Sequence, residues 1–256
     1  MVCIHNVDTN EKLKFSDSSK QAKLKALANQ YGRIYSFSLP SGYSCSFARE
    51  CLSKSDRSTG RVTDGKDTLY RCFSATTEAA FPSARNQRWH NFDLLRKYKS
   101  CADCMAQLIL RSMPKVGKVS VIRIHIGGDF FNQFYFDAWL IVATNRPDVK
   151  FYAYTKSLPY LINRLDSIPN NLELNASRGG SRDNLIEEYN LKAAEVVFHP
   201  SEAEKLNLEI DHDERHAINP GPSFALLLHG TQPKDSKASS ALKTLKNEDI
   251  KFSYSA

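Results

Sequence analysis

The chain has 256 residues, of which 41% are hydrophobic and 25% are charged, which is ordinary for a globular protein with a sizeable core. No apolar run reaches the length of a membrane span and the N-terminus has no signal-peptide core, so we expect a cytoplasmic protein without a membrane partner. The formal net charge of +7 permits contact with nucleic acid, although the basic residues are scattered along the chain.

The predicted organisation has three parts. Residues 1–32 read as an N-terminal extension that contains a short basic helix over 18–30. Residues 33–230 read as a single β/α domain, with a cysteine loop at 40–75 after its first strand. Residues 231–256 read as a polar C-terminal tail.

Six strands are predicted within the domain, and helical patterns lie between them. The strands are 33–39, 119–126, 151–155, 172–177, 194–199 and 223–229, and the helices are 84–98, 101–113, 132–144, 159–166, 183–189 and 201–206. This alternation predicts right-handed βαβ units around a parallel sheet. Six strands are too few for a complete eight-stranded barrel, so we expect an open, partial β/α barrel. A doubly wound open sheet is the alternative.

Five of the six cysteines lie between residues 45 and 104. In a reducing compartment such a group indicates metal ligands or reactive thiols rather than a disulfide framework. Cys45, Cys51 and Cys72 follow the first strand, and thiolates suit zinc, copper(I) and iron–sulfur clusters. Tetrahedral zinc needs a fourth ligand, whereas a four-iron cluster can be held by three protein thiolates with one iron left open.

A fourth thiolate can come from the Cys-x-x-Cys formed by Cys101 and Cys104. Ser100 is the predicted N-cap of the helix that contains this pair, and the helix leads into the second strand. Its first turn is therefore expected beside the cysteine loop, where the helix dipole favours a thiolate. Cys101 continues an apolar stripe, so Cys104 is the candidate ligand. The sequence leaves open whether either sulfur faces the loop or the core.

Polar residues also follow the other predicted strands, at the carboxyl edge where parallel β/α folds carry their chemistry. The segment Gly127-Gly128-Asp129 ends the second strand, and its carboxylate can accept a hydrogen bond from an amine or a hydroxyl. Lys156, Ser177 and Arg178 can bind a carboxylate or a phosphate. Two Gly-Gly pairs would let a ligand approach the backbone. His125 is expected to be a buried or hydrogen-bonded core residue.

Several segments between residues 33 and 180 resemble the bacteriophage family known as gene product 88. They are Ser38–Cys45, Cys72–Ala75, Pro82–Arg85, Arg123–Phe131, Asp137–Trp139 and Phe151–Ser157. The resemblance implies a phage-encoded protein in the cytoplasm of the host cell.

The layout is also similar, more distantly, to that of radical S-adenosylmethionine enzymes. In those enzymes three cysteines after the first strand of a partial six-stranded barrel hold a [4Fe-4S] cluster, and a Gly-Gly-Glu-like motif binds the methionine amine. The resemblance implies that Cys45, Cys51 and Cys72 hold such a cluster and that Gly127-Gly128-Asp129 is the amine-binding motif. Ser177 and Arg178 match the polar contacts of the fourth strand. The cysteine spacing is wider than in those enzymes, and Asp replaces Glu.

Three hypotheses follow. In the first, one iron of the cluster is open and the protein performs radical chemistry with S-adenosylmethionine on an unknown small molecule. In the second, a fourth cysteine such as Cys104 saturates the cluster, and the protein serves a redox partner without catalysis. In the third, the protein is zinc-stabilised and associated with nucleic acid.

Overall fold

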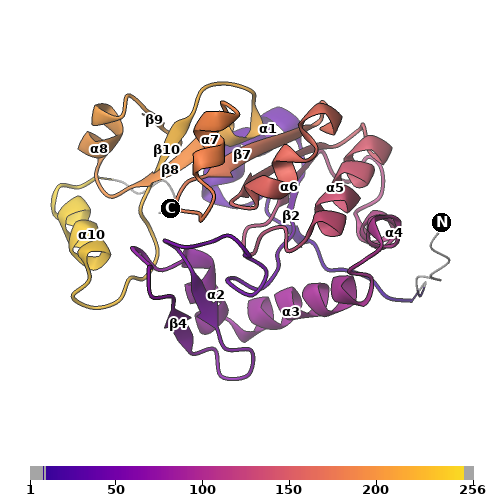
Figure 1. The fold of residues 1–256 in the computed structure, drawn as a ribbon, viewed down its shortest axis with the longest axis horizontal. Coiled ribbons are helices and arrows are strands. Elements are labelled where there is room, and N and C mark those ends of the chain that lie inside the picture. The colour runs from indigo at the N-terminus through magenta and orange to yellow at the C-terminus, as the bar shows by residue number, and fades with distance from the viewer. Residues whose placement is uncertain (1–7, 9, 251–256) are drawn as a thin grey trace.

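The computed structural model describes residues 8 and 10–250, which form a mixed α/β fold around one large sheet (Figure 1). The strands of this sheet are β1 Ser16–Asp17, β2 Ile34–Ser36, β5 Val121–Ile124, β6 Lys150–Thr155, β7 Leu172–Ser177, β8 Ala193–Val197, β9 Glu209–Ile210 and β10 Phe224–Leu227. Their order across the sheet is β1-β2-β5-β6-β7-β8-β10-β9. A separate antiparallel hairpin of β3 Ser53–Ser55 and β4 Val62–Asp64 lies within the cysteine loop.

The six predicted strands are confirmed as β2, β5, β6, β7, β8 and β10. Each pairs in parallel with the next one along the chain. This part of the sheet therefore grows in one direction without the reversal of strand order that a doubly wound sheet requires. The sheet is not a closed barrel, because its edges are the short strands β1, which is antiparallel to β2, and β9.

Ten α-helices occur in the described residues: α1 Lys25–Tyr31, α2 Phe73–Ala80, α3 Pro82–Lys97, α4 Ala102–Ser112, α5 Gln133–Asn145, α6 Leu158–Ile162, α7 Asn184–Glu188, α8 Pro200–Lys205, α9 Arg215–Ile218 and α10 Lys237–Asn247. Short 3-10 turns cover Ala22–Leu24 and Leu165–Ser167.

Helix α5 illustrates how local chemistry sets the two ends of a helix. The Asn132 side chain caps its start by accepting from the Tyr135 N–H, and the helix ends just before Arg146, which precedes a proline.

Both faces of the sheet are buried, as is usual for parallel strands. The alternation of side chains along β5 sends Ile122 and Ile124 into the larger core, where Trp139 of α5 is fully buried. Val121, on the opposite face, packs with Leu27 of α1 in a smaller cluster. The helix-covered larger core holds the sheet in place, so the carboxyl ends of its strands form a fixed platform.

The two predicted end segments contain ordered elements. Strand β1 pairs with β2, and the predicted helix over 18–30 is shorter, with α1 beginning at Lys25. Within the predicted polar tail, residues 237–247 form α10, with Leu245 fully buried. Residues 251–256 lie outside the described part of the chain.

A buried ionic network lies on the smaller-core face of the sheet and joins the N-terminal segment to α9. The Glu214 carboxylate, 1% exposed, accepts from Lys23 Nζ at 2.5 Å and from the Tyr152 hydroxyl at 2.6 Å, and it pairs with Arg123. Burial alone would raise the pKa of Glu214, but Arg123 and Lys23 hold it at about 2. The network therefore stabilises the fold fully above the ordinary carboxyl pKa of 4.5, and this stabilisation is lost as the pH falls toward 2.

Replacing Glu214 by alanine should lower the free energy of unfolding by about 3–5 kcal/mol at neutral pH, because the buried guanidinium of Arg123 would lose the carboxylate with which it pairs. Denaturant unfolding measures this change. The matched control is Asp93→Ala, which breaks the exposed pair of Asp93 with Arg57 and should cost about 0–1 kcal/mol. Equal losses in the two variants would contradict this account of the network.

Candidate functional site

The cysteine loop crosses the carboxyl edge of the sheet and is anchored at three places. At β5, the Leu39 N–H donates to the Gly127 carbonyl at 2.8 Å. At β7, the Glu50 N–H donates to the Gly179 carbonyl at 2.9 Å. After β10, the Gln232 side chain accepts from the Arg71 N–H at 2.7 Å. These contacts fix the cysteine loop over the carboxyl ends of the strands, and we refer to the loop in this position as the roof of the site.

Both Gly-Gly pairs help to seat this roof. Gly128 has φ of +86°, and a Cβ there would lie 2.5 Å from Ser44 Oγ and 2.6 Å from Leu39 Cβ. Gly179 has φ of +89°, and a Cβ there would lie 3.0 Å from Glu50 Oε2. The sequence predicted that these glycines leave space for a ligand. In the structure the cysteine loop fills that space, and a residue larger than glycine at 128 or 179 would displace the loop.

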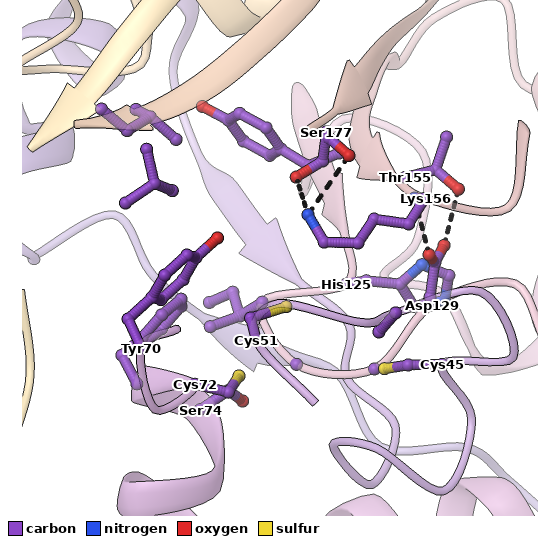
Figure 2. A pocket seen from close by; sticks show the side chains of 18 of the residues that line it. Cys45, Cys51, Tyr70, Cys72, Ser74, His125, Asp129, Thr155, Lys156 and Ser177 are labelled. Atoms are coloured by element: carbon purple, nitrogen blue, oxygen red, sulfur yellow. Dashed lines mark hydrogen bonds between the residues drawn. The ribbon is translucent and has the colours of Figure 1, made fainter. Parts of the chain in front are cut away.

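A cavity of about 160 Å³ lies between the roof and the strand ends, well above the roughly 10–15 Å³ that one water needs (Figure 2). Eight of the predicted site residues line it: Cys45, Cys51, Cys72, Gly127, Gly128, Asp129, Lys156 and Ser177. The structure therefore brings together residues from the loop after β2 and from the ends of β5, β6 and β7.

The three cysteines of the cavity are free thiols. Burial raises the pKa of Cys45 well above its ordinary value. Burial, and then the nearby Cys51, raise the pKa of Cys72 to about 11, against the opposing effect of the backbone N–H groups of Ser74 and Ala75. These two thiols are therefore protonated at neutral pH in the metal-free protein, and binding of a metal or cluster would release their protons.

Among residues 8 and 10–250, no three His, Cys, Asp or Glu side chains are grouped closely enough to hold one metal ion. Thiolates on a single zinc each lie about 2.3 Å from the ion and must almost touch one another. In a [4Fe-4S] cluster each cysteine binds a different iron, so the sulfurs stand further apart. In this protein three cysteines, Cys45, Cys51 and Cys72, line one cavity.

Asp129 is 5% exposed and joins the ends of β5 and β6. Its carboxylate accepts from the Thr155 hydroxyl at 2.7 Å and from the Lys156 N–H at 2.8 Å (Figure 2), and also from the Phe130 N–H at 2.7 Å. Burial raises its pKa, and these hydrogen bonds oppose the rise. Two carboxylate oxygens offer about four acceptor positions, so roughly one remains for a ligand in the cavity.

Lys156 and Ser177 meet on the wall of the cavity, as Figure 2 shows, whereas Arg178 does not reach it. Lys156 Nζ donates to Ser177 Oγ at 2.6 Å and to the Arg178 carbonyl at 2.5 Å. The Arg178 side chain instead pairs with Glu187 and Glu195, at 2.6 and 3.2 Å. The Arg178 side chain therefore lies away from the cavity in this structure, and its predicted contact with a ligand stays a prediction.

Cys104 does not join the other thiols. It forms a disulfide with Cys101, is 3% exposed, and does not line the cavity. Cys101, rather than the predicted Ser100, is the N-cap of α4, and its sulfur accepts from the Cys104 N–H at 3.2 Å. The structure thus provides three cysteines at the cavity and no fourth one among the described residues.

Two histidines that were not assigned to the site also line the cavity, His125 at the end of β5 and His229 after β10. Burial lowers the pKa of His125 to about 3 and that of His229 to about 4. Both imidazoles are therefore neutral at physiological pH. His125 has φ of +64°, a conformation that nothing in the sequence pattern indicates.

The two histidines make the metal-free protein sensitive to mild acid. Below pH 6.5 they become protonated in the unfolded chain but stay neutral in the fold, until about pH 4 for His229 and about pH 3 for His125. The free energy of unfolding should therefore fall by about 1.4 kcal/mol per pH unit for each histidine between pH 6.5 and 4.5. Denaturant unfolding across this range tests the slope. His229→Asn should roughly halve it, and a flat profile in the parent protein would refute the assignment.

No helix in residues 8 and 10–250 is long and apolar enough to cross a membrane.

No solved structure matches the chain. Over 95 residues the chain is 30% identical to the Gene 88 protein of Mycobacterium phage L5, an alignment that covers 33% of this chain and 38% of that protein. The model of a family described as Gene product 88 matches residues 6–247, nearly the whole chain. The chain therefore belongs to the bacteriophage gene product 88 family.

Proposed function

We propose that this phage protein binds a [4Fe-4S] cluster through Cys45, Cys51 and Cys72. The observation that carries the proposal is that these three free cysteines, from one anchored loop, all line the cavity at the carboxyl edge of the sheet. Cysteine thiolates are the ligands that hold iron–sulfur clusters in proteins.

The architecture supports a scaffold of the radical S-adenosylmethionine type, an open and partial β/α barrel. Six parallel strands follow one another in one direction, and the cysteine loop comes directly after the first of them. Gly127-Gly128-Asp129 faces the same cavity from the second of these strands. The support comes from the order of the strands and from the place of each motif along them. The spacing of the cysteines differs from that in radical S-adenosylmethionine enzymes.

The absence of Cys104 from the cavity favours three protein ligands over four, and so an iron open to a small molecule. With S-adenosylmethionine as that molecule, the cluster would supply an electron for its reductive cleavage. The acceptor position left on Asp129 can take a hydrogen bond from an amine, and the buried ammonium of Lys156 favours an anionic group nearby. The zinc-stabilised alternative and an association with nucleic acid both stay predictions from the sequence.

Protein purified without air should be brown, with absorbance at about 400 nm. Cys45→Ala, Cys51→Ala and Cys72→Ala should each lose most of this absorbance, because two thiolates hold a cluster poorly. The matched control is the double variant Cys101→Ala and Cys104→Ala, which removes the same chemistry outside the cavity and should keep the cluster. Loss of absorbance in the control with retention in Cys72→Ala would contradict the ligand assignment.

The open iron leads to a separate prediction. After reduction with dithionite, the cluster-loaded protein should cleave S-adenosylmethionine to methionine and a 5′-deoxyadenosyl radical. Without substrate, this radical takes a hydrogen atom from the reductant or the buffer, and the resulting 5′-deoxyadenosine is measured by liquid chromatography. Asp129→Asn should slow this conversion at least tenfold, because the amide lacks the charge that attracts an amine and cannot accept all of the same hydrogen bonds. No cleavage by protein with an intact, reduced cluster would leave electron transfer or cluster binding as the function.

A further inference from the structure

A second, open hollow of about 380 Å³ lies where the roof meets α3 and the segment before α5, and it shares no lining residue with the cavity beneath the roof. Four aromatic residues line it: Tyr43, Trp89, Phe92 and Phe131. Their rings form a series, with successive centroid distances of 4.8, 5.9 and 5.3 Å. Trp89 and Phe92 are almost buried and form its floor, whereas Tyr43 is 39% exposed and Phe131 is half-buried.

Basic side chains surround these rings. Arg96 and Lys99 line the hollow, and the Arg96 guanidinium lies 5.4 Å from the centre of the Phe92 ring. The Lys54 ammonium lies 5.3 Å from the centre of the Tyr43 ring. All three basic residues are exposed, and none of them pairs with a carboxylate in the part of the chain that the structure describes. Their charges are therefore available to an anionic ligand.

The uncharged polar groups of the hollow already have partners. The Asn132 side chain accepts from the Tyr135 N–H and donates to the Lys99 carbonyl, both at 2.8 Å. The Ser46 hydroxyl donates to the Phe131 carbonyl at 3.4 Å. The hollow therefore offers aromatic faces and positive charge, but no polar side chain dedicated to the edge of a base or to a ribose 2′-hydroxyl.

We propose that this hollow binds single-stranded nucleic acid, with bases stacked on Tyr43 and Phe131 and phosphates beside Lys54, Arg96 and Lys99. Aromatic faces stack on any unpaired base, and nearby cations attract the phosphates of the strand. Lys54 lies outside the lining of the hollow, so the positive charge extends beyond the space of one nucleotide. This extension favours a strand over a free nucleotide. The inference goes beyond the proposed function and does not depend on the cluster.

The test is the fluorescence anisotropy of a labelled strand of about 20 thymidines mixed with the full-length protein. Three available cations predict a slope of about −2 for the logarithm of the binding constant against that of the salt concentration. Arg96→Gln and Lys99→Gln should each reduce the steepness of this slope by about 0.7. Tyr43→Ala should weaken binding at least about fivefold, and Tyr43→Phe should retain it because the ring remains.

Two controls remove the same chemistry from other exposed positions. Lys205→Gln changes α8 and Tyr189→Ala changes the end of α7, both of which lie far from α3 (Figure 1). Both variants should bind like the parent protein. The strand can also be located, because the chain has two tryptophans and Trp139 is fully buried. Binding should quench the emission of Trp89, and this quenching should disappear in Trp89→Phe.

No binding at about 50 mM salt would overturn the inference and leave the proposed cluster untouched. Equal weakening in the two control variants would overturn it as well, and so would a duplex or a mononucleotide that binds as tightly as the strand. A uridine strand should bind as well as the thymidine strand, and a tenfold difference would contradict this mode of binding. If Tyr43→Ala fails to fold, the two exposed charge variants decide: an unchanged salt slope in both overturns the inference.

Discussion

The site depends on the attachment of the cysteine loop to the carboxyl ends of the strands. Hydrogen bonds to Gly127 and Gly179 fix two points of the loop, and the pair of Arg71 with Gln232 fixes a third. Only glycine at 128 and 179 leaves room for this attachment. Without it, cysteines separated by five and twenty residues would have no reason to share a cavity. Because of this attachment, cysteines that are far apart in the sequence line the same cavity.

The sheet beneath the loop gives the cavity a rigid floor. The aromatic core around Trp139 supports one face, and the ionic network of Glu214 closes the other. Arg123 takes part in this network and also lines the cavity, so the floor of the site and the stability of the fold share a residue. Asp129 adds a link between β5 and β6 at the level of the cavity. The site is therefore built from regular elements, which hold side chains more precisely than a free loop would.

Much of this arrangement could be predicted from the sequence. The six parallel strands have clear apolar patterns, and strand ends in such folds meet at one edge, so the convergence of Cys45, Gly128 and Lys156 was predictable. The two-residue strands β1 and β9 are too short to leave a pattern. Neither the outward direction of Arg178 nor the disulfide of Cys104 could be predicted, because both depend on how elements are oriented in three dimensions. The strained backbone of His125 has no sequence signal at all.

The proposed cluster is the centre of the site, and the metal content of the protein tests its presence most directly. Protein isolated without air should contain about four irons and four acid-labile sulfides per chain, and replacement of Cys45, Cys51 or Cys72 should remove most of both. Stoichiometric zinc without iron, in protein that has never met oxygen, would contradict the central claim.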